Sequence, residues 1–359
     1  MMVGLYIHVP FCLAKCPYCD FYSVKYSRKK AEQYKNAVIR NIKHYQISDT
    51  VFDTVYFGGG TPILLWREIC EIIKHIHISD NCEITVEANP SCCTEEALAA
   101  LRQAGVNRLS LGIQSFDDCE LSALGRRHSG DKAEKAVLLA HDCGFKNISA
   151  DLMLATPGQT EESLAKSLER CCSLPVSHIS AYMLKIEENT PFAKYELTLP
   201  DEDTTCAMYL QTVNTLAQNG FHQYEISNFA LDGMKSRHNL KYWRCEEYIG
   251  IGPAAHSYFG GRRFYIDRDL QGFTGSEIQQ EITEDENPGG FEEYAMLKLR
   301  LSEGLSFEEC TAFGVDKQVI LQRCKKIPDR LISIDKEKVC LTPKGFLLSN
   351  QIIAVITGF

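Results

Sequence analysis

Short apolar runs alternate with amphipathic stretches through the first half of the chain. The apolar runs predict strands at residues 5–11, 51–57, 83–88, 108–113, 148–154 and 178–184. Helical periodicity predicts helices at residues 28–46, 63–75, 117–124, 131–143 and 161–172, and another that begins at Thr94 and stops at Gly105. Because strands and helices follow one another in turn, the pattern predicts βαβ units and a parallel sheet.

The number of strands leaves two folds open. Six strands are too few for a complete eight-stranded barrel, so the pattern fits either an incomplete barrel or an open doubly wound sheet. In both folds ligands bind on the loops that follow the carboxyl ends of the strands. We therefore expect the functional residues on those loops.

The pattern changes after residue 200. We expect a helix at residues 203–219, a strand at 221–229, a Gly- and Ala-rich segment at 250–258 and a hairpin turn at Gly260-Gly261. Residues 275–290 are acidic and polar and contain Pro288-Gly289-Gly290, which predicts a linker. The sequence thus predicts two units, a large one over 1–275 and a small one of helices and a hairpin over 290–359.

Composition narrows the class of protein. The net charge of −9 and the lack of a basic stripe argue against nucleic-acid binding. No apolar stretch is long enough to span a membrane, and no basic region precedes the first apolar run, so we expect neither a transmembrane segment nor a secretory signal. Sixteen cysteines in such a chain predict a reducing compartment, here the cytoplasm.

Cys12, Cys16 and Cys19 directly follow the first predicted strand. Three thiolates on one loop hold metal but leave a four-coordinate site one ligand short, as in sites that keep a position open for chemistry. Iron–sulfur clusters are held by cysteine thiolates, so the spacing favours a cluster with one open iron. A zinc site completed by a distant residue, and unligated thiols, are the alternatives. We expect the remaining cysteines to be structural.

Polar groups follow several of the other predicted strands. The turn Gly58-Gly59-Gly60-Thr61-Pro62 ends the second strand, and its glycines allow backbone to approach a ligand closely. Glu87 ends the third strand and Gln114 the fourth, while Asp151 lies within the apolar fifth strand. A buried carboxylate needs a partner, for which Arg126 is a candidate. Because these groups converge on one edge of the sheet, they predict a ligand site there.

Together these motifs resemble the radical SAM superfamily. The likeness is carried by Tyr6-Ile-His-Val-Pro-Phe-Cys12, the three cysteines, Gly58 to Pro62, Gly112-Ile-Gln-Ser-Phe-Asp117, Leu124-Gly-Arg-Arg-His128 and Asp151-Leu-Met-x3-Pro-Gly158. It is strongest to the branch that contains oxygen-independent coproporphyrinogen III oxidase and the HemW haem chaperones, and it covers nearly the whole chain. The resemblance implies an incomplete (β/α)6 barrel with a small C-terminal α+β, winged-helix-like domain.

The resemblance also implies roles for individual residues. Cys12, Cys16 and Cys19 would hold a 4Fe–4S cluster whose fourth iron binds S-adenosylmethionine (SAM). The residues that would flank cluster and cofactor or contact SAM are Tyr6, Tyr18, Gly59, Gly60, Thr61, Glu87, Gln114, Arg126 and Asp151. Met183 and His256 are looser matches to further residues of the cofactor pocket.

Two features separate the oxidase from the haem chaperone. In the oxidase another cysteine stands where this chain has Phe21, and an N-terminal extension precedes its first strand. The run His238-Asn239-Leu240-Lys241-Tyr242-Trp243 is instead typical of the chaperones. Imidazole can ligate haem iron, so His238 is predicted as the axial ligand, with His256 as its rival.

The resemblance thus predicts a haem chaperone that passes haem to acceptor proteins, with respiratory-chain haem proteins among the expected acceptors and a homodimer as the expected assembly. The alternative is oxidative decarboxylation of coproporphyrinogen III. Whether the chain is an enzyme stays open at this point.

Overall fold

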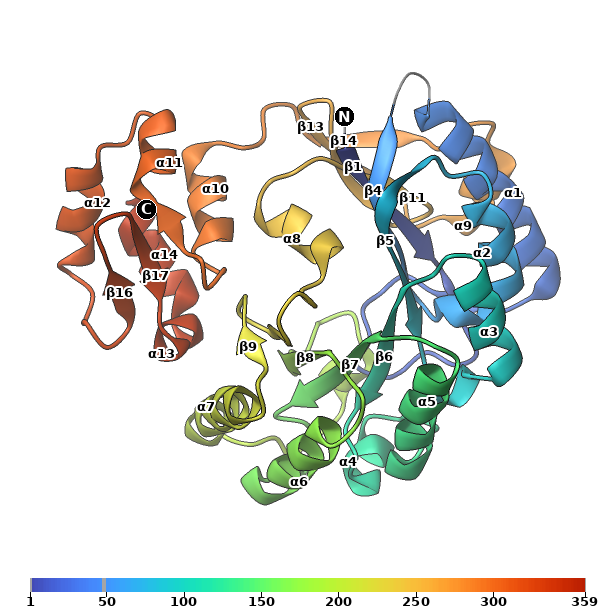
Figure 1. Ribbon diagram of the computed structural model, residues 1–359, viewed down its shortest axis with the longest axis horizontal. Coiled ribbons are helices and arrows are strands. Elements are labelled where there is room, and N and C mark those ends of the chain that lie inside the picture. The colour runs from blue at the N-terminus through green and yellow to red at the C-terminus, as the bar shows by residue number, and fades with distance from the viewer. Residues whose placement is uncertain (1, 47–49, 359) are drawn as a thin grey trace.

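The computed structural model describes residues 2–46 and 50–358. Its centre is a run of parallel strands that lie side by side in chain order (Figure 1). They are β1 (Met2–Val9), β4 (Val51–Gly59), β5 (Ile78–Ala88), β6 (Arg108–Gln114), β7 (Asn147–Leu154) and β8 (His178–Met183). All six predicted strands are therefore present, and the prediction of a parallel sheet is confirmed.

Helices cover the outer face of this sheet (Figure 1). They are α1 (Arg28–Tyr45), α2 (Trp66–Ile73), α3 (Glu95–Gln103), α4 (Asp118–Ala123), α5 (Gly130–Asp142) and α6 (Glu161–Cys172). Local chemistry fixes several helix starts. Thr94 caps α3 by accepting the Ala97 N–H, as predicted, and Thr160 forms a capping box with Ser163 at α6.

The sheet extends beyond these strands on both sides. One side continues from β1 through β11 (Tyr248–Ile251), β12 (His256–Phe259), β13 (Arg262–Ile266) and β14 (Glu281–Asp285). The other continues from β8 through β10 (Asn228–Ala230) to β9 (His222–Gln223). β1 and β8 do not pair with each other in this order, so the six-stranded barrel is incomplete, as the resemblance implies.

Two predictions for the second half were wrong. The expected strand at 221–229 is the hairpin of β9 and β10, because the buried Glu225 carboxylate accepts the Ser227 N–H and turns the chain there. The expected linker at 275–290 contains β14, which pairs with β13. The sequence did not indicate β14 because most of its side chains face solvent and lack an apolar pattern. Backbone pairing with β13 holds the strand in place. The Gly260-Gly261 turn is confirmed, with φ of 60° and 73°.

The C-terminal segment lies beside the barrel (Figure 1). It comprises α10 (Phe291–Lys298), α11 (Phe307–Ala312), α12 (Lys317–Cys324), α13 (Pro343–Leu347), α14 (Ser349–Thr357) and a sheet of β15 (Leu305–Ser306), β17 (Lys338–Leu341) and β16 (Ile332–Ile334). Arg244 joins it to the barrel by pairing with Glu303 at 2.9 Å. Among the described helices, none has the length and apolar character needed to cross a membrane.

The remaining elements shape the edges of the barrel. The short strands β2 (Phe11–Cys12) and β3 (Val24–Lys25) bracket the cysteine loop. The 3-10 helices η1 (Pro62–Leu65), η2 (Pro90–Cys92) and η3 (Pro191–Lys194) follow β4, β5 and β8, and the helices of the second half are α7 (Glu202–Gln218), α8 (Arg237–Trp243) and α9 (Leu270–Gly275).

Alternation along the barrel strands puts apolar and polar residues on opposite faces. On β6, Leu109 and Leu111 belong to the hydrophobic core, whereas Arg108 and Ser110 line a cavity inside the barrel. On β7, Ile148 and Ala150 are in the core and Asp151 lines the cavity. The interior of a complete barrel is normally filled by branched apolar side chains. This interior instead encloses a cavity reached by several polar side chains, so it is the place to look for a ligand.

Candidate functional site

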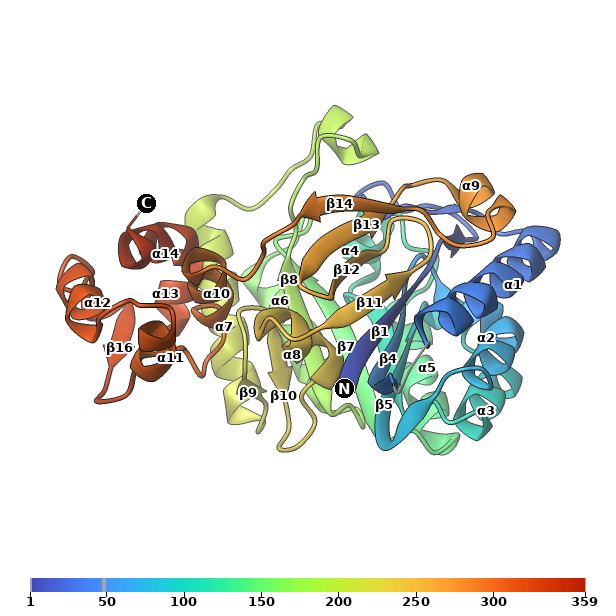
Figure 2. The ribbon, with the colours of Figure 1, turned by 90° about the horizontal axis from the view of Figure 1, so that it is seen from above.

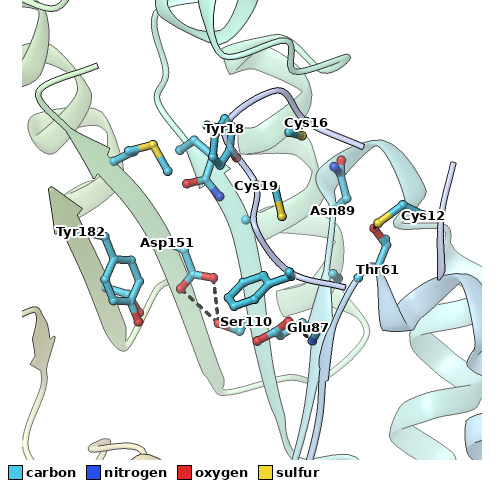
Figure 3. A pocket seen from close by; sticks show the side chains of 18 of the residues that line it. Cys12, Cys16, Tyr18, Cys19, Thr61, Glu87, Asn89, Ser110, Asp151 and Tyr182 are labelled. Atoms are coloured by element: carbon cyan, nitrogen blue, oxygen red, sulfur yellow. Dashed lines mark hydrogen bonds between the residues drawn. The ribbon is translucent and has the colours of Figure 1, made fainter. Parts of the chain in front are cut away.

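A cavity of about 530 Å³ runs from the carboxyl ends of the strands into the barrel, and Figure 3 shows its side chains. Its wall combines the cysteine loop with residues from five barrel strands and the loops that follow them. The predicted site residues on this wall are Cys12, Cys16, Tyr18, Cys19, Gly59, Gly60, Thr61, Glu87, Gln114, Arg126 and Asp151. Its size is that of a small-molecule or cofactor site.

The cysteine loop is held at both ends by backbone hydrogen bonds. The Tyr26 N–H donates to the Cys12 carbonyl at 2.9 Å, and the Cys19 N–H donates to the Cys16 carbonyl at 3.1 Å. Further along, His8 Nε2 lies 2.9 Å from the Tyr22 carbonyl oxygen, and the Tyr22 hydroxyl accepts the Leu270 N–H at 3.0 Å. The loop therefore has a fixed path at the mouth of the cavity.

The three thiols are spread along one side of the cavity (Figure 3). Cys12 Sγ accepts the Thr61 hydroxyl at 3.6 Å, and Cys16 Sγ accepts from Arg126 Nη1 at 3.5 Å. In the described part of the chain, no three His, Cys, Asp or Glu side chains stand close enough to hold a single metal ion. Cysteine thiolates are the ligands that hold iron–sulfur clusters, so these three side chains fit the donor set of a cluster.

The glycine turn after β4 brings backbone against the start of the cysteine loop. Gly59 has a φ of 107°, and a Cβ there would lie 2.6 Å from His8 Cε1. A Cβ on Gly60 would lie 2.6 Å from the Phe11 carbonyl oxygen, and the Thr61 N–H donates to that same carbonyl at 2.7 Å. Glycine is therefore required at Gly59 by both backbone conformation and space, and at Gly60 by space.

Two carboxyl groups on the cavity wall are shifted towards the neutral form. Burial raises the pKa of Glu87 to about 7, and the nearby Asp151 adds to the shift. Glu87 accepts hydrogen bonds from the Tyr56 hydroxyl at 2.9 Å and the Gly59 N–H at 3.0 Å. Burial also raises the pKa of Asp151, against the effect of its hydrogen bond from Ser110 (Figure 3). Paired shifts of this kind are typical of functional sites.

Arg126 connects the cysteine loop to the barrel. Its Nη2 donates to the Gly112 carbonyl, and its Nη1 reaches Cys16 Sγ at 3.5 Å and the Tyr18 hydroxyl at 3.4 Å. The prediction that Arg126 pairs with Asp151 was wrong. Serine hydroxyls satisfy the Asp151 carboxylate instead, and the guanidinium of Arg126 is turned towards the sulfur atoms.

Gln114 ends β6 in an uncommon backbone conformation. Its φ is 72°, which lies in the left-handed region that non-glycine residues rarely adopt, and its side chain lines the cavity. Such conformations cluster at ligand sites.

Four of the predicted residues do not line the cavity. Tyr6 lies behind its wall, where its hydroxyl is 3.0 Å from His8 Nδ1. Met183 is at the exposed end of β8. His256 is exposed on β12, and His238 is fully buried on α8. These four residues therefore lie outside the cavity that the other predicted site residues line.

His238, the predicted axial haem ligand, is bonded within the protein in this structure. Its Nδ1 lies 2.8 Å from the Thr54 hydroxyl and its Nε2 lies 2.7 Å from the Tyr242 hydroxyl, so both ring nitrogens are occupied. Its ring stacks against Tyr56 at 5.2 Å, and burial lowers its pKa to about 3. The His-Asn-x-x-Tyr-Trp run thus packs α8 into the barrel, where its Asn239 side chain reaches the cavity.

Several cavity residues escaped the sequence analysis. They are Asn89, Arg108, Ser110, Ser180 and Tyr182, together with Tyr56, whereas Asn239 was noted only as part of the run that begins at His238. Asn89 offered a signal, since it follows Glu87 at the end of a strand. Ser110 and Ser180 were hidden inside strands, where alternation alone does not tell which face is hollow.

Comparison with known proteins identifies the chain's relatives. Residues 6–171 match the radical SAM superfamily, and residues 291–348 match the HemN C-terminal domain. The chain is 36% identical to the heme chaperone HemW of Bacillus subtilis, over 99% of this chain and 100% of that protein. It is 33% identical to HemW of Lactococcus lactis over 97% of this chain and 95% of that one, and 34% identical to HemW of Escherichia coli over 89% and 88%.

Among solved structures, the coproporphyrinogen III oxidase HemN of Escherichia coli superposes with a TM-score of 0.81, covering 99% of this chain and 90% of that one. Their identity is 21%, so this likeness concerns the fold. It confirms the radical SAM type of incomplete barrel with a C-terminal domain. Because its sequence aligns along almost its whole length with HemW proteins at a third or more of positions, the chain belongs to the HemW family of haem chaperones.

Proposed function

We propose that this chain is a haem chaperone that carries a 4Fe–4S cluster with bound SAM and delivers haem to acceptor proteins. The observation that carries the proposal is the cavity at the carboxyl ends of the strands, which joins three cysteines to Glu87, Arg126 and Asp151 in a full-length relative of heme chaperones. We further propose residues 1–275 and 290–359 as its two units.

Different residues of the cavity would hold the cluster and SAM. Cys12, Cys16 and Cys19 would ligate three irons, and the cluster, when bound, supplies one-electron chemistry at its open iron. Arg126 already donates towards Cys16 Sγ, which stabilises negative charge on that sulfur. Thr61 does the same for Cys12. Hydrogen bonds to sulfur tune the potential of such clusters, so these two side chains would set it.

The inner wall would receive SAM. Glu87, Gln114 and Asp151 present oxygen and nitrogen atoms along one side of the cavity. Tyr18 lies beside Arg126 at the mouth and packs against Phe192 at a ring distance of 6.0 Å. This packing would limit the access of water to a bound cluster. Tyr6 and the looser match Met183 would support this pocket from outside the wall.

We propose haem and haem-accepting proteins, respiratory-chain haem proteins among them, as partners of this chain. A homodimer and a cytoplasmic location are part of the same proposal, and nucleic acid is not among the partners. The HemN likeness favours only a shared fold, and Phe21 stands where the oxidase has a further cysteine, so we assign no coproporphyrinogen oxidase activity.

The test starts from protein reconstituted with iron and sulfide without oxygen. We expect about four irons per chain, a change in the electron paramagnetic resonance of the reduced cluster when SAM is added, and haem that stays bound through gel filtration. Cys16→Ala should lose the cluster signal, whereas Cys70→Ala should keep it, since Cys70 is a half-buried residue of α2 whose thiol donates to the Ala100 carbonyl of α3. Retention of no haem, or formation of protoporphyrinogen from coproporphyrinogen, would contradict the proposal.

A further inference from the structure

Arg108 is an arginine inside the barrel that has no partner. It begins β6 and lines the cavity, and only 1% of its surface is exposed. Its Nε and Nη1 have no hydrogen-bond partner in the described part of the chain, and no described carboxylate forms an ion pair with it. A buried charge is costly unless it is paired. The guanidinium therefore has donors to offer to a ligand in the cavity.

The acidic groups near Arg108 already have hydrogen-bond partners of their own. Glu83 accepts two backbone N–H groups at the start of α8, at 3.1 and 3.0 Å. Asp151 accepts the hydroxyls of Ser110 and Ser149, at 2.9 and 3.2 Å. Both carboxylates act on the guanidinium through their charge, although neither pairs with it directly. Direct pairing with them therefore does not account for an arginine at this position.

A second free donor reaches the same end of the cavity. Asn239 lies on α8 and lines the cavity, and its side-chain amide has no hydrogen-bond partner among the described residues. The His238 N–H bonds the start of α8 to Glu83 on β5. Two residues further along β5, Thr85 is the register partner of Arg108. Figure 2 shows α8 close to the start of β1, at the end of the barrel where β6 also begins.

These two donors lie deeper in the barrel than the residues proposed to receive SAM. Gln114 ends β6, about 20 Å of strand beyond Arg108. Glu87 lies between these two levels, since it pairs in register with Ser110. A ligand held by Arg108 and a cofactor at the carboxyl ends of the strands would therefore occupy different levels of one cavity.

The surroundings favour a ligand with a single negative charge. Guanidinium groups bind carboxylates and phosphates through charge-assisted hydrogen bonds. Glu83, Glu87 and Asp151 lie on neighbouring strands of the same interior, and they repel each additional negative charge on a ligand. A carboxylate carries one such charge, whereas a phosphate group carries about −1.5 to −2 near pH 7. Tyr56 and Tyr182 on the cavity wall offer ring surface to an organic group.

We propose that the deep end of the cavity is a second ligand site, which binds a small organic monocarboxylate through Arg108 and Asn239. The carboxylate accepts hydrogen bonds from the guanidinium and from the amide. The organic part contacts the rings of Tyr56 and Tyr182, below the level of SAM. This site is separate from the one proposed for the cluster and SAM, and the inference does not depend on haem.

The test is butyrate binding to the cluster-loaded full chain without oxygen, measured by saturation-transfer nuclear magnetic resonance at constant ionic strength. Acetate should displace butyrate, and phosphate should not. Arg108→Met should weaken butyrate binding about tenfold or more, because a hydrogen bond to a charged group is lost. Arg28→Met is the matched control, since Arg28 is exposed at the start of α1, and it should bind butyrate as the parent chain does.

Two further measurements keep the inference testable if Arg108→Met does not fold. Asn239→Ala, which removes a half-buried amide, should weaken butyrate binding severalfold. Added SAM should leave butyrate bound, because the two ligands lie at different levels of the cavity. Parental affinity in Asn239→Ala and in any folded Arg108→Met, displacement by SAM or phosphate, or no butyrate binding by the parent chain would overturn the inference. Each of these results would leave the proposed haem chaperone function standing.

Discussion

Glu87 offers a prediction that needs neither cluster nor haem. Its pKa is raised from the ordinary 4.5 to about 7, mainly by burial and then by Asp151. Between these two values the folded chain binds a proton that the unfolded chain has released. The free energy of unfolding therefore falls as the pH rises through this window, and the contribution of Glu87 is largest below pH 4.5.

The size of the effect follows from the shift. A shift of roughly 2.5 pH units corresponds to about 3.4 kcal/mol, of which about 2.5 kcal/mol falls between pH 5 and pH 8. Glu87 is half-buried on the cavity wall, where water screens part of the charge. We therefore expect a loss of about 1–2.5 kcal/mol for the apoprotein over this range, and none from this position in Glu87→Gln.

Chemical unfolding of the metal-free chain at pH 5, 6, 7 and 8 measures this difference. The curve of free energy against pH should be flatter for Glu87→Gln than for the parent chain. Glu169→Gln, a substitution of an exposed residue on α6, is the control and should follow the parent curve. A difference in the free energy of unfolding between the parent chain and Glu87→Gln that does not change with pH would refute the reasoning. It would mean that Glu87 has its ordinary pKa and is already ionised in both the folded and the unfolded chain.

Further predictions concern the loop and the turn that face Glu87. Cys12→Ala or Cys19→Ala should abolish the visible absorption of the reconstituted cluster, and a variant that keeps all its iron would exclude that cysteine as a ligand. Gly59→Ala should cost about 1–2 kcal/mol in backbone strain, plus the clash with His8, which thermal unfolding would detect as a lower Tm. Arg126→Lys should weaken SAM binding measured by calorimetry, because one ammonium cannot reach Gly112, Cys16 and Tyr18 together. Equal affinities would show that this bridge is dispensable.

The sequence pattern predicted the strands and helices because each carries its own signal, and the resemblance then favoured the barrel over an open sheet. Thr94 marks a helix start by a hydrogen bond within one turn, and the apolar residues of the strands recur because they pack under the helices. β14 carried no such signal. Its residues are mostly exposed, and its position depends on pairing with β13, a contact that local sequence does not encode.

The site was predicted where its residues form contiguous motifs. The cysteine loop and the glycine turn are each read from a few neighbouring positions. Ser110 and Arg108 were missed because they reach the cavity through the curvature of the whole sheet. The motif around His238 did not reveal that its ring lies inside the barrel, because its contact with Thr54 comes from a distant strand. The role of His238 as a haem ligand stays a prediction.

The interior of the barrel explains why so many polar residues are buried in one place. Arg108 is fully buried, and its Nε and Nη1 have no hydrogen-bond partner in the described part of the chain. Unpaired buried donors and neighbouring carboxyl groups such as Asp151 both reduce stability. A barrel filled with leucine and valine would avoid both costs. The chain retains its polar interior beneath a loop of three thiols, and the cavity is therefore best explained as a site built for a polar, charged cofactor such as SAM.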